Sequence, residues 1–287
     1  MASTWFLVEN RRPWGHRAVE EDPLPSGVRE WLAEQTEERA PARTVFIRRP
    51  DREAGPLRFF VARVGEGETG IWSATLDSLE ELQELDLSGL ESGEPAGLER
   101  ERGPLLLVCA NGRRDRCCAR RGLPLFRALG RMAAGSVAWL STHLGGHRYA
   151  AVSVALPAGA CYGYLRPERA GELLSATLER RLVLDNLRGR TFFPPVVQAA
   201  DCFLRRREGL RGEDDVRWIG ETEEVESGTV TLSSRDGSVF RVVVNRSREE
   251  ALVSCSPRKR KEIEEFSLEK IEVVEGRSSD GGERGSP

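Results

Sequence analysis

The pattern of hydrophobic and polar positions predicts a mixed α/β chain. Short apolar runs bounded by turn residues indicate strands at 4–8, 44–49, 57–64, 104–109, 137–143, 150–157 and 160–165. Apolar residues at helical spacing indicate helices at 26–39, 123–132, 167–181 and 194–206. An Asp-Gly turn inside 228–245 adds a hairpin near the C-terminus.

The order of these elements divides the chain into four parts. We expect an N-terminal α/β region over 1–100, because an acidic stretch broken by Gly and Pro follows its strands. A central domain over 101–210, a β-rich extension over 211–275 and a disordered tail over 276–287 complete the division. The central βαβ unit, hairpin and helix follow the order of a thioredoxin-like domain, and the first hundred residues are a candidate for a diverged second lobe.

Composition and charge exclude several classes of protein. The chain has 287 residues, of which 39% are hydrophobic, so it can bury a substantial core. Its 43 basic and 46 acidic residues give a formal charge of −3, which provides no overall attraction to nucleic acid or to an anionic membrane. No apolar stretch reaches the roughly 20 residues of a membrane span, and the first residues lack a secretory signal. We therefore expect a cytoplasmic protein that binds neither nucleic acid nor membrane.

The cysteines divide into two groups. Six cysteines are too few for a disulfide scaffold, so in a reducing compartment we expect them to be unpaired, and therefore buried, catalytic or metal-bound. Cys109 ends a predicted strand, and Cys117 and Cys118 lie in the basic loop that follows; chemistry alone does not decide between these two neighbours as a ligand. The other three occupy apolar contexts, where we expect small hydrophobic side chains: Cys161, Cys202 and Cys255.

Only three histidines occur in the chain, and two of them lie four residues apart. His143 and His147 belong to the segment Thr-His-Leu-Gly-Gly-His, whose Gly145 and Gly146 permit a sharp turn, whereas His16 reads as a turn residue. Two thiols and two imidazoles in one compact domain form the kind of ligand set used by zinc and by iron–sulfur centres. The sequence thus predicts a metal centre.

These segments resemble a known family. The runs CANGRRDRCCARRGLPL, STHLGGHRYAAVSVALP and YGYL, with the flanking WFLVENRRPWG and RGRTFFPPVVQAADCFLR, are similar over residues 4–210 to the sucrase/ferredoxin-like family of thioredoxin-like ferredoxins. The resemblance implies a 2Fe-2S cluster held by two cysteines and two histidines, and the family spacing favours Cys118 over Cys117. The implied ligands are Cys109, Cys118, His143 and His147.

A cluster with these ligands predicts a soluble electron-transfer protein that has no catalytic residue of its own and exchanges electrons with a separate redox partner protein. Neutral imidazoles make the centre less negative than four thiolates do, so we expect a higher reduction potential, coupled to protonation of a histidine ligand. The loop beside the cysteines carries a local positive charge, which either docks an acidic partner or is a solvated basic surface. Its arginines are Arg113, Arg114, Arg116, Arg120 and Arg121, with Arg148 close by; Arg114 is also a candidate to pair with Asp115.

Two other functions compete with this hypothesis. A thiol-based redox enzyme could use Cys109, Cys117 or Cys118, although the chain has no C-x-x-C motif there. A structural zinc module is the second alternative, although eight residues between Cys109 and Cys118 make an atypical zinc loop. A zinc protease is disfavoured because the histidine segment lacks the glutamate of H-E-x-x-H, and no carboxylate pair suggests glycoside hydrolysis. The electron donor, the electron acceptor and the oligomeric state remain open.

Overall fold

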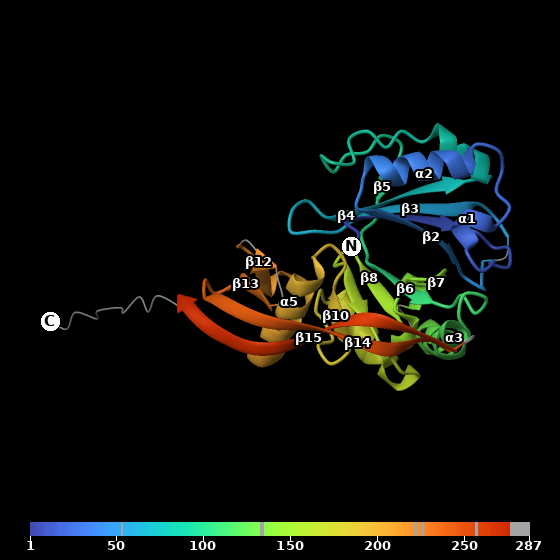
Figure 1. Ribbon diagram of the computed structural model, residues 1–287. Coiled ribbons are helices and arrows are strands. Elements are labelled where there is room, and N and C mark those ends of the chain that lie inside the picture. The colour runs from blue at the N-terminus through green and yellow to red at the C-terminus, as the bar shows by residue number, and fades with distance from the viewer. Residues whose placement is uncertain (53, 133–134, 221–222, 225–226, 256–257, 276–287) are drawn as a thin grey trace.

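A computed structural model describes residues 1–52, 54–132, 135–220, 223–224, 227–255 and 258–275. Two sheets and the helices beside them make up the fold (Figure 1). The larger sheet has ten strands in the order β10-β9-β8-β6-β7-β2-β1-β3-β4-β5, and the smaller sheet has five strands, β11 to β15.

The strands of the larger sheet are β1 (Thr4–Glu9), β2 (Ala42–Arg48), β3 (Leu57–Arg63), β4 (Gly70–Leu76), β5 (Glu99–Arg100), β6 (Leu105–Cys109), β7 (Ala138–Ser141), β8 (Ser153–Leu156), β9 (Ala160–Tyr162) and β10 (Leu187–Arg190). The α-helices are α1 (Ala18–Glu21), α2 (Val28–Glu38), α3 (Arg116–Gly130), α4 (Ala170–Leu178) and α5 (Pro195–Glu208). Short 3-10 turns lie between them at η1 (Leu79–Glu84), η2 (Gly135–Val137), η3 (His147–Tyr149), η4 (Pro167–Arg169) and η5 (Glu213–Asp215).

The two halves of the larger sheet repeat one topology. In the first half, β1 runs parallel to β2 and antiparallel to β3, and β3 pairs antiparallel with β4. In the second half, β6 runs parallel to β7 and antiparallel to β8, and β8 pairs antiparallel with β9. A helix connects the two parallel strands in both cases, α2 in the first half and α3 in the second. The N-terminal region therefore has the strand order of the central domain, and the two share one continuous sheet.

The halves meet where β2 pairs antiparallel with β7, through Ile47 opposite Ser141 and Arg48 opposite Leu140. Just beyond this ladder the backbone N–H of Thr142 donates to the carbonyl of Phe46 (2.8 Å), and the N–H of Phe46 donates to Oγ1 of Thr142 (3.0 Å). Both residues are buried, so each bond satisfies a group that water cannot reach. This seam places the residue after Thr142, which is His143, at the boundary between the halves.

The C-terminal region forms the second sheet around helix α5. Its strands are β11 (Val216–Trp218), β12 (Glu223–Glu224), β13 (Ser227–Ser234), β14 (Val239–Cys255) and β15 (Arg258–Glu275). Val197, Ala200 and Leu204 of α5 pack with Val230 and Val242 of the sheet in one buried cluster. The long strands β14 and β15 then continue past this cluster, and β14 reaches the side of helix α3 (Figure 1).

Several sequence-based boundaries differ from the structure. Helix α3 begins at Arg116 and not at 123, because Asp115 caps it and Pro124 is accommodated inside it, so Cys117 and Cys118 lie on a helix and not in a loop. The strand over 258–275 is not predicted individually, because charged residues occupy so many of its positions that apolar and polar residues do not alternate clearly. The predicted disordered tail, 276–287, lies outside the described residues.

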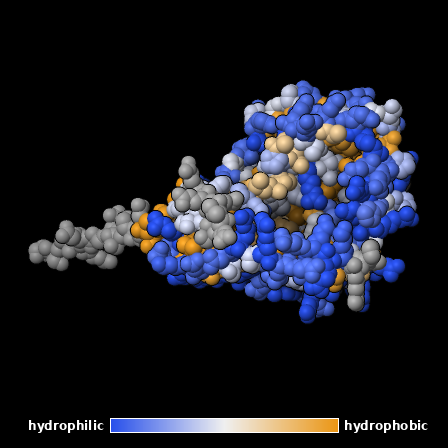
Figure 2. All heavy atoms as spheres, viewed as in Figure 1, coloured by the Kyte–Doolittle hydropathy of each residue, from blue (hydrophilic) through white to orange (hydrophobic). Residues whose placement is uncertain are grey.

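Hydrophilic residues cover most of the face shown in Figure 2, and hydrophobic residues appear on it only in small groups. Among the described residues, no helix combines the length and the apolar character needed to cross a bilayer.

The seam between the halves gives a first prediction. In the variant Thr142→Val the side chain no longer accepts the bond from Phe46, whose buried N–H is left without a partner. We expect the free energy of unfolding to fall by about 1–3 kcal/mol. Denaturant titration measures this change, and Thr142→Ser, which keeps the hydroxyl, should lose much less. Equal losses in the two variants would show that the hydroxyl bond does not stabilise the seam.

Candidate metal centre

The first thiol lies where strand β6 ends, and the second lies in the first turn of helix α3. The turn between them is ordered by Asn111, whose carbonyl accepts from the N–H of Asp115 (3.2 Å) and whose Oδ1 accepts from the N–H of Arg114 (3.2 Å). Asp115 then caps the helix by accepting from the N–H of Cys117 (2.9 Å). Cys109 and Cys118 are each 1% exposed.

The approach of the helix to the strand depends on Gly122. This residue lies one turn after Cys118 on the buried face of α3, and a Cβ atom there would overlap the carbonyl oxygen of Cys109. Only glycine leaves room for the helix backbone to touch the strand end. The contact therefore sets how close the two sulfur atoms can come.

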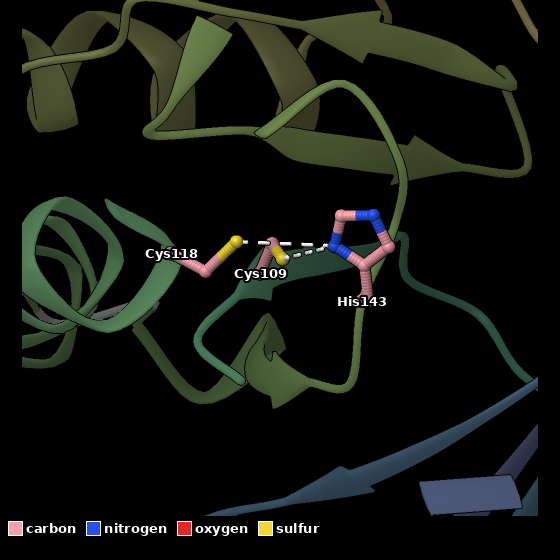
Figure 3. Close-up of side chains that lie close together, drawn as sticks. All are labelled: Cys109, Cys118 and His143. Atoms are coloured by element: carbon pink, nitrogen blue, oxygen red, sulfur yellow. Dashed lines mark hydrogen bonds between the residues drawn. The ribbon is translucent and has the colours of Figure 1, made fainter. Parts of the chain in front are cut away.

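His143 reaches the same point from the segment that follows β7. Its Nδ1 lies 4.0 Å from Sγ of Cys109 and 3.8 Å from Sγ of Cys118, and all three donor atoms lie within 4.8 Å of one another (Figure 3). Arg43 of β2 fixes the backbone here, because its guanidinium donates to the carbonyls of His143 (2.5 Å) and Leu144 (2.8 Å). The N-terminal half thus positions a side chain of the second half.

The protonation of the two thiols is linked. Hydrogen bonding from Cys118 holds the pKa of Cys109 well below its ordinary value, against the opposing effect of burial, and His143 adds to the lowering. The pKa of Cys118 is raised, because its proton is held between the two sulfurs and because the site is buried. The pair therefore resembles one thiolate stabilised by one thiol and an imidazole, which is a donor set ready for a soft metal ion.

His147 lies beside this group but outside the 4.8 Å cluster. The turn before it uses Gly145 and Gly146, whose φ angles are +93° and +61°, and its ring centroid lies 5.0 Å from that of His143. Nε2 of His147 is 3.9 Å from Oδ2 of Asp115, whereas its Nδ1 is buried and has no hydrogen-bond partner among the described residues. Burial and then the neighbouring His143 lower the pKa of His147, which favours the neutral, ligating form.

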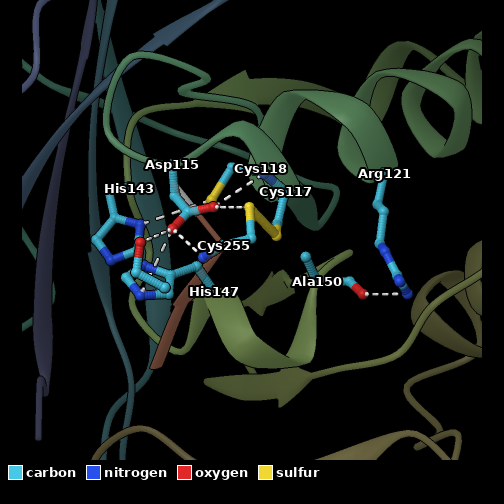
Figure 4. Close-up of a disulfide and its surroundings, with 9 residues drawn as sticks. Asp115, Cys117, Cys118, Arg121, His143, His147, Ala150 and Cys255 are labelled. Carbon is cyan, nitrogen blue, oxygen red and sulfur yellow. Dashed lines mark hydrogen bonds and ion pairs between the residues drawn. A yellow bond between two sulfur atoms is a disulfide. The ribbon is translucent and has the colours of Figure 1, made fainter. Parts of the chain in front are cut away.

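The tip of the β14–β15 hairpin is attached to the same turn. Cys117 and Cys255 form a disulfide, and Asp115 accepts from the hydroxyl of Ser254 (2.6 Å) and from the N–H of Cys255 (3.2 Å) (Figure 4). The expectation that the cysteines are unpaired is therefore wrong for Cys117 and Cys255, and Cys255 is not an apolar packing residue. The hairpin carries it across the molecule to Cys117, a contact that no local sequence pattern signals.

The basic residues of the turn differ in their environments. Arg113, Arg116 and Arg120 are exposed, and Arg121 donates to the carbonyl of Ala150 at 3.4 Å. Arg114 contacts Nδ1 of His16 (3.2 Å) and not Asp115, because the carboxylate is occupied by the helix cap and the hairpin. The expected pairing of Arg114 with Asp115 is thus wrong.

The sequence does not reveal two features that support the site, namely the capping role of Asp115 and the participation of Arg43. Asp115 joins the helix cap, the hairpin tip and His147, and its position just before Cys117 at a helix start was the available signal. Arg43 comes from the other half of the sheet, about a hundred residues away, and no motif marks it.

Comparison with known proteins supplies the family. The sucrase/ferredoxin-like family model matches residues 1–189, which is well over half of the chain. The chain belongs to the sucrase/ferredoxin-like family. The match includes both halves of the larger sheet almost to its last strand and all the donor residues described above. Comparisons with curated proteins and with solved structures give no match.

The glycine contact predicts the behaviour of a variant of this sucrase/ferredoxin-like protein. Gly122→Ala forces α3 away from the end of β6, so we expect the free energy of unfolding to fall by about 1–3 kcal/mol and Cys118 to react faster with alkylating reagents. Gly130→Ala is the matched control on the same helix, because a Cβ there meets nothing within 4 Å. It should leave stability unchanged or raise it by up to about 1 kcal/mol. If Gly122→Ala behaves as Gly130→Ala does, the contact does not set the position of Cys118.

Proposed function

We propose that this chain is an electron-transfer protein that holds a 2Fe-2S cluster through Cys109, Cys118, His143 and His147. The observation that carries the proposal is the convergence of two buried sulfur atoms and Nδ1 of His143 within 4.8 Å, although they come from three separate segments. Such an arrangement of soft donors is typical of metal centres and is costly to assemble for packing alone.

The fourth donor has independent support. The Nδ1 atom of His147 is buried without a hydrogen-bond partner among the described residues, which costs free energy unless a ligand satisfies it. Its Nε2 lies 3.9 Å from Oδ2 of Asp115, which places a carboxylate near the distal nitrogen, where such groups commonly orient a ligating imidazole. The residues therefore fit a centre with two thiolates and two imidazoles.

When bound, the cluster would supply one-electron chemistry; the protein determines its environment. Two neutral imidazoles in place of two thiolates reduce the negative charge of the centre, which favours a potential above that of all-cysteine ferredoxins. Arg43 and Asp115 hold the segments that carry the donors, and neither lies among the proposed ligands.

The scaffold is consistent with a thioredoxin-like ferredoxin. Each half has a parallel βαβ unit followed by an antiparallel hairpin, which is the order expected for that fold. At the end of β1, where the second half has Cys109 at the end of β6, the first half has the buried carboxylate of Glu9, paired with Arg11 and Arg52. We therefore propose one cluster per chain, in the second half.

The proposal includes a separate redox partner protein. The exposed arginines of the α3 turn, such as Arg113 and Arg116, would attract an acidic partner surface near the centre. A thiol enzyme is less well supported, because the low-pKa sulfur of Cys109 is only 1% exposed and a substrate disulfide cannot reach it. A structural zinc module would use the same donors, so the metal content of the purified protein must decide between zinc and the cluster.

The test is to purify the full chain without oxygen and to measure iron, acid-labile sulfide, zinc and the visible spectrum. We expect about two iron and two sulfide per chain with a red-brown colour. A colourless protein with about one zinc would establish the structural alternative, and a metal-free protein with reactive thiols would favour thiol chemistry.

Adjacent cysteines provide a matched pair of variants for the same assay. Cys118→Ser should lose most of the iron and sulfide, because it removes a proposed ligand. Cys117→Ser removes only the disulfide to Cys255 and should keep the cluster. The proposal is contradicted if Cys117→Ser abolishes the cluster while Cys118→Ser retains it.

A further inference from the structure

A cleft of about 970 Å³ opens beside the candidate metal centre, between the two halves of the larger sheet. One wall comes from α1, α2 and β2 of the first half, and the other comes from Asn111, Arg114, Thr142 and His143 of the second half. This volume is at the upper end of the range for small-molecule sites in proteins. Because His143 lines the cleft, an occupant would lie next to a proposed ligand of the cluster.

The cleft is positively charged. Arg17, Arg29, Arg43 and Arg114 line it, against the carboxylates of Glu20 and Glu37. None of these four arginines makes a salt bridge within the described part of the chain, although many other arginines of the protein do. Four arginines therefore share the cleft with two carboxylates and pair with neither, and this excess of positive charge favours an anionic occupant.

The arginines divide into fixed and available donors. Arg29 donates to the carbonyls of Val19 and Asp22 (2.6 Å for Asp22), and Arg43 donates to those of His143 and Leu144, so both are held in place by neutral groups. Among the described residues, the side chain of Arg114 hydrogen-bonds to the imidazole of His16 alone, and the side chain of Arg17 makes no hydrogen bond. Arg17 and Arg114 are thus free to bind an anion through paired N–H donors.

Much of the remaining lining is aliphatic and suits an apolar body, although His16, Thr36 and Thr44 also contribute to it. This part of the wall is formed by Ala18, Val19, Leu32, Ala33, Pro41 and Ala42. An inorganic anion would leave this surface wet, whereas a molecule with an anionic group and an apolar body would cover it and gain free energy from the burial.

We propose that the cleft binds a small organic acid, with its anionic group on Arg17 and Arg114 and its apolar body against the aliphatic wall. The site is formed by the protein itself, so it goes beyond the proposed cluster and does not require it. The acid would lie beside His143, which is the side from which a small redox-active or regulatory molecule could contact the metal centre.

A pair of fluorescent probes with the same aromatic body tests this proposal. The full-length protein is titrated with 8-anilinonaphthalene-1-sulfonate, which is anionic, and with N-phenyl-1-naphthylamine, which is neutral. We expect one sulfonate per chain, bound about tenfold more tightly than the neutral probe. In the variant Arg17→Gln/Arg114→Gln the affinity for the sulfonate should fall about tenfold while the affinity for the neutral probe stays the same.

Arg127→Gln/Arg131→Gln is the control for the loss of two positive charges, because both arginines are exposed and neither lines the cleft. It should leave both affinities unchanged, and thermal melting confirms that each variant is folded. Equal affinities of the wild type for the two probes would overturn the proposal, as would Arg17→Gln/Arg114→Gln binding the sulfonate as the wild type does. So would sulfonate binding that falls as much in the control variant as in Arg17→Gln/Arg114→Gln.

Metal-free protein tests the organic-acid site independently of the proposed cluster. Protein without iron should still bind the sulfonate, since no metal ligand is needed to form the cleft. A chain that binds the sulfonate but takes up no iron would support the organic-acid site and count against the proposed function alone. A chain that takes up iron but does not bind the sulfonate would support the proposed function and count against the organic-acid site alone.

Discussion

The contact between helix α3 and the end of strand β6 is the constraint on which the site depends. Gly122 allows the helix backbone to touch the carbonyl of Cys109, so that Cys118, one turn earlier, faces the first sulfur. The capping of the helix by Asp115 fixes where its first turn begins and hence where Cys118 points. Two thiols from different elements thereby come close enough to share a proton, and with a metal ion they would share the metal.

The imidazoles reach this point because two similar half-sheets are joined along β2 and β7. The seam sets the start of the histidine segment, and Arg43 reaches across it to hold two carbonyls of that segment. Asp115 then connects the helix, His147 and the end of β14, so that the β-rich C-terminal region lies against the site. This region begins beyond the residues that the family model matches. Parts of the chain far apart in sequence therefore support one small group of donors, and the same junction of the halves leaves the arginine-lined cleft beside it.

Local patterns in the sequence predicted the parts of the structure that depend on neighbours along the chain. The apolar run before Cys109 and the two glycines before His147 indicated a strand end and a sharp turn, and both are present. The predicted helix start at 123 is too late, because the basic segment around Cys117 reads as a loop unless Asp115 is recognised as the cap of a helix. The disulfide between Cys117 and Cys255 and the role of Arg43 could not be predicted, since each depends on tertiary contacts between segments about a hundred residues or more apart. The hydrophobic pattern also does not predict β15, because apolar and polar residues alternate little in an exposed strand that is rich in charged residues.

The most direct test of the account is X-ray absorption at the iron edge of the anaerobically reconstituted full chain, which counts the atoms bound to iron. Two cysteines, two histidines and bridging sulfides predict an average of about three sulfur neighbours and one nitrogen neighbour per iron. Substituting either His143 or His147 with cysteine should halve the nitrogen signal, and substituting both should replace it by sulfur. Iron surrounded by sulfur alone in the wild type, or a chain that binds no iron under these conditions, would contradict the convergence of thiols and imidazoles on one cluster.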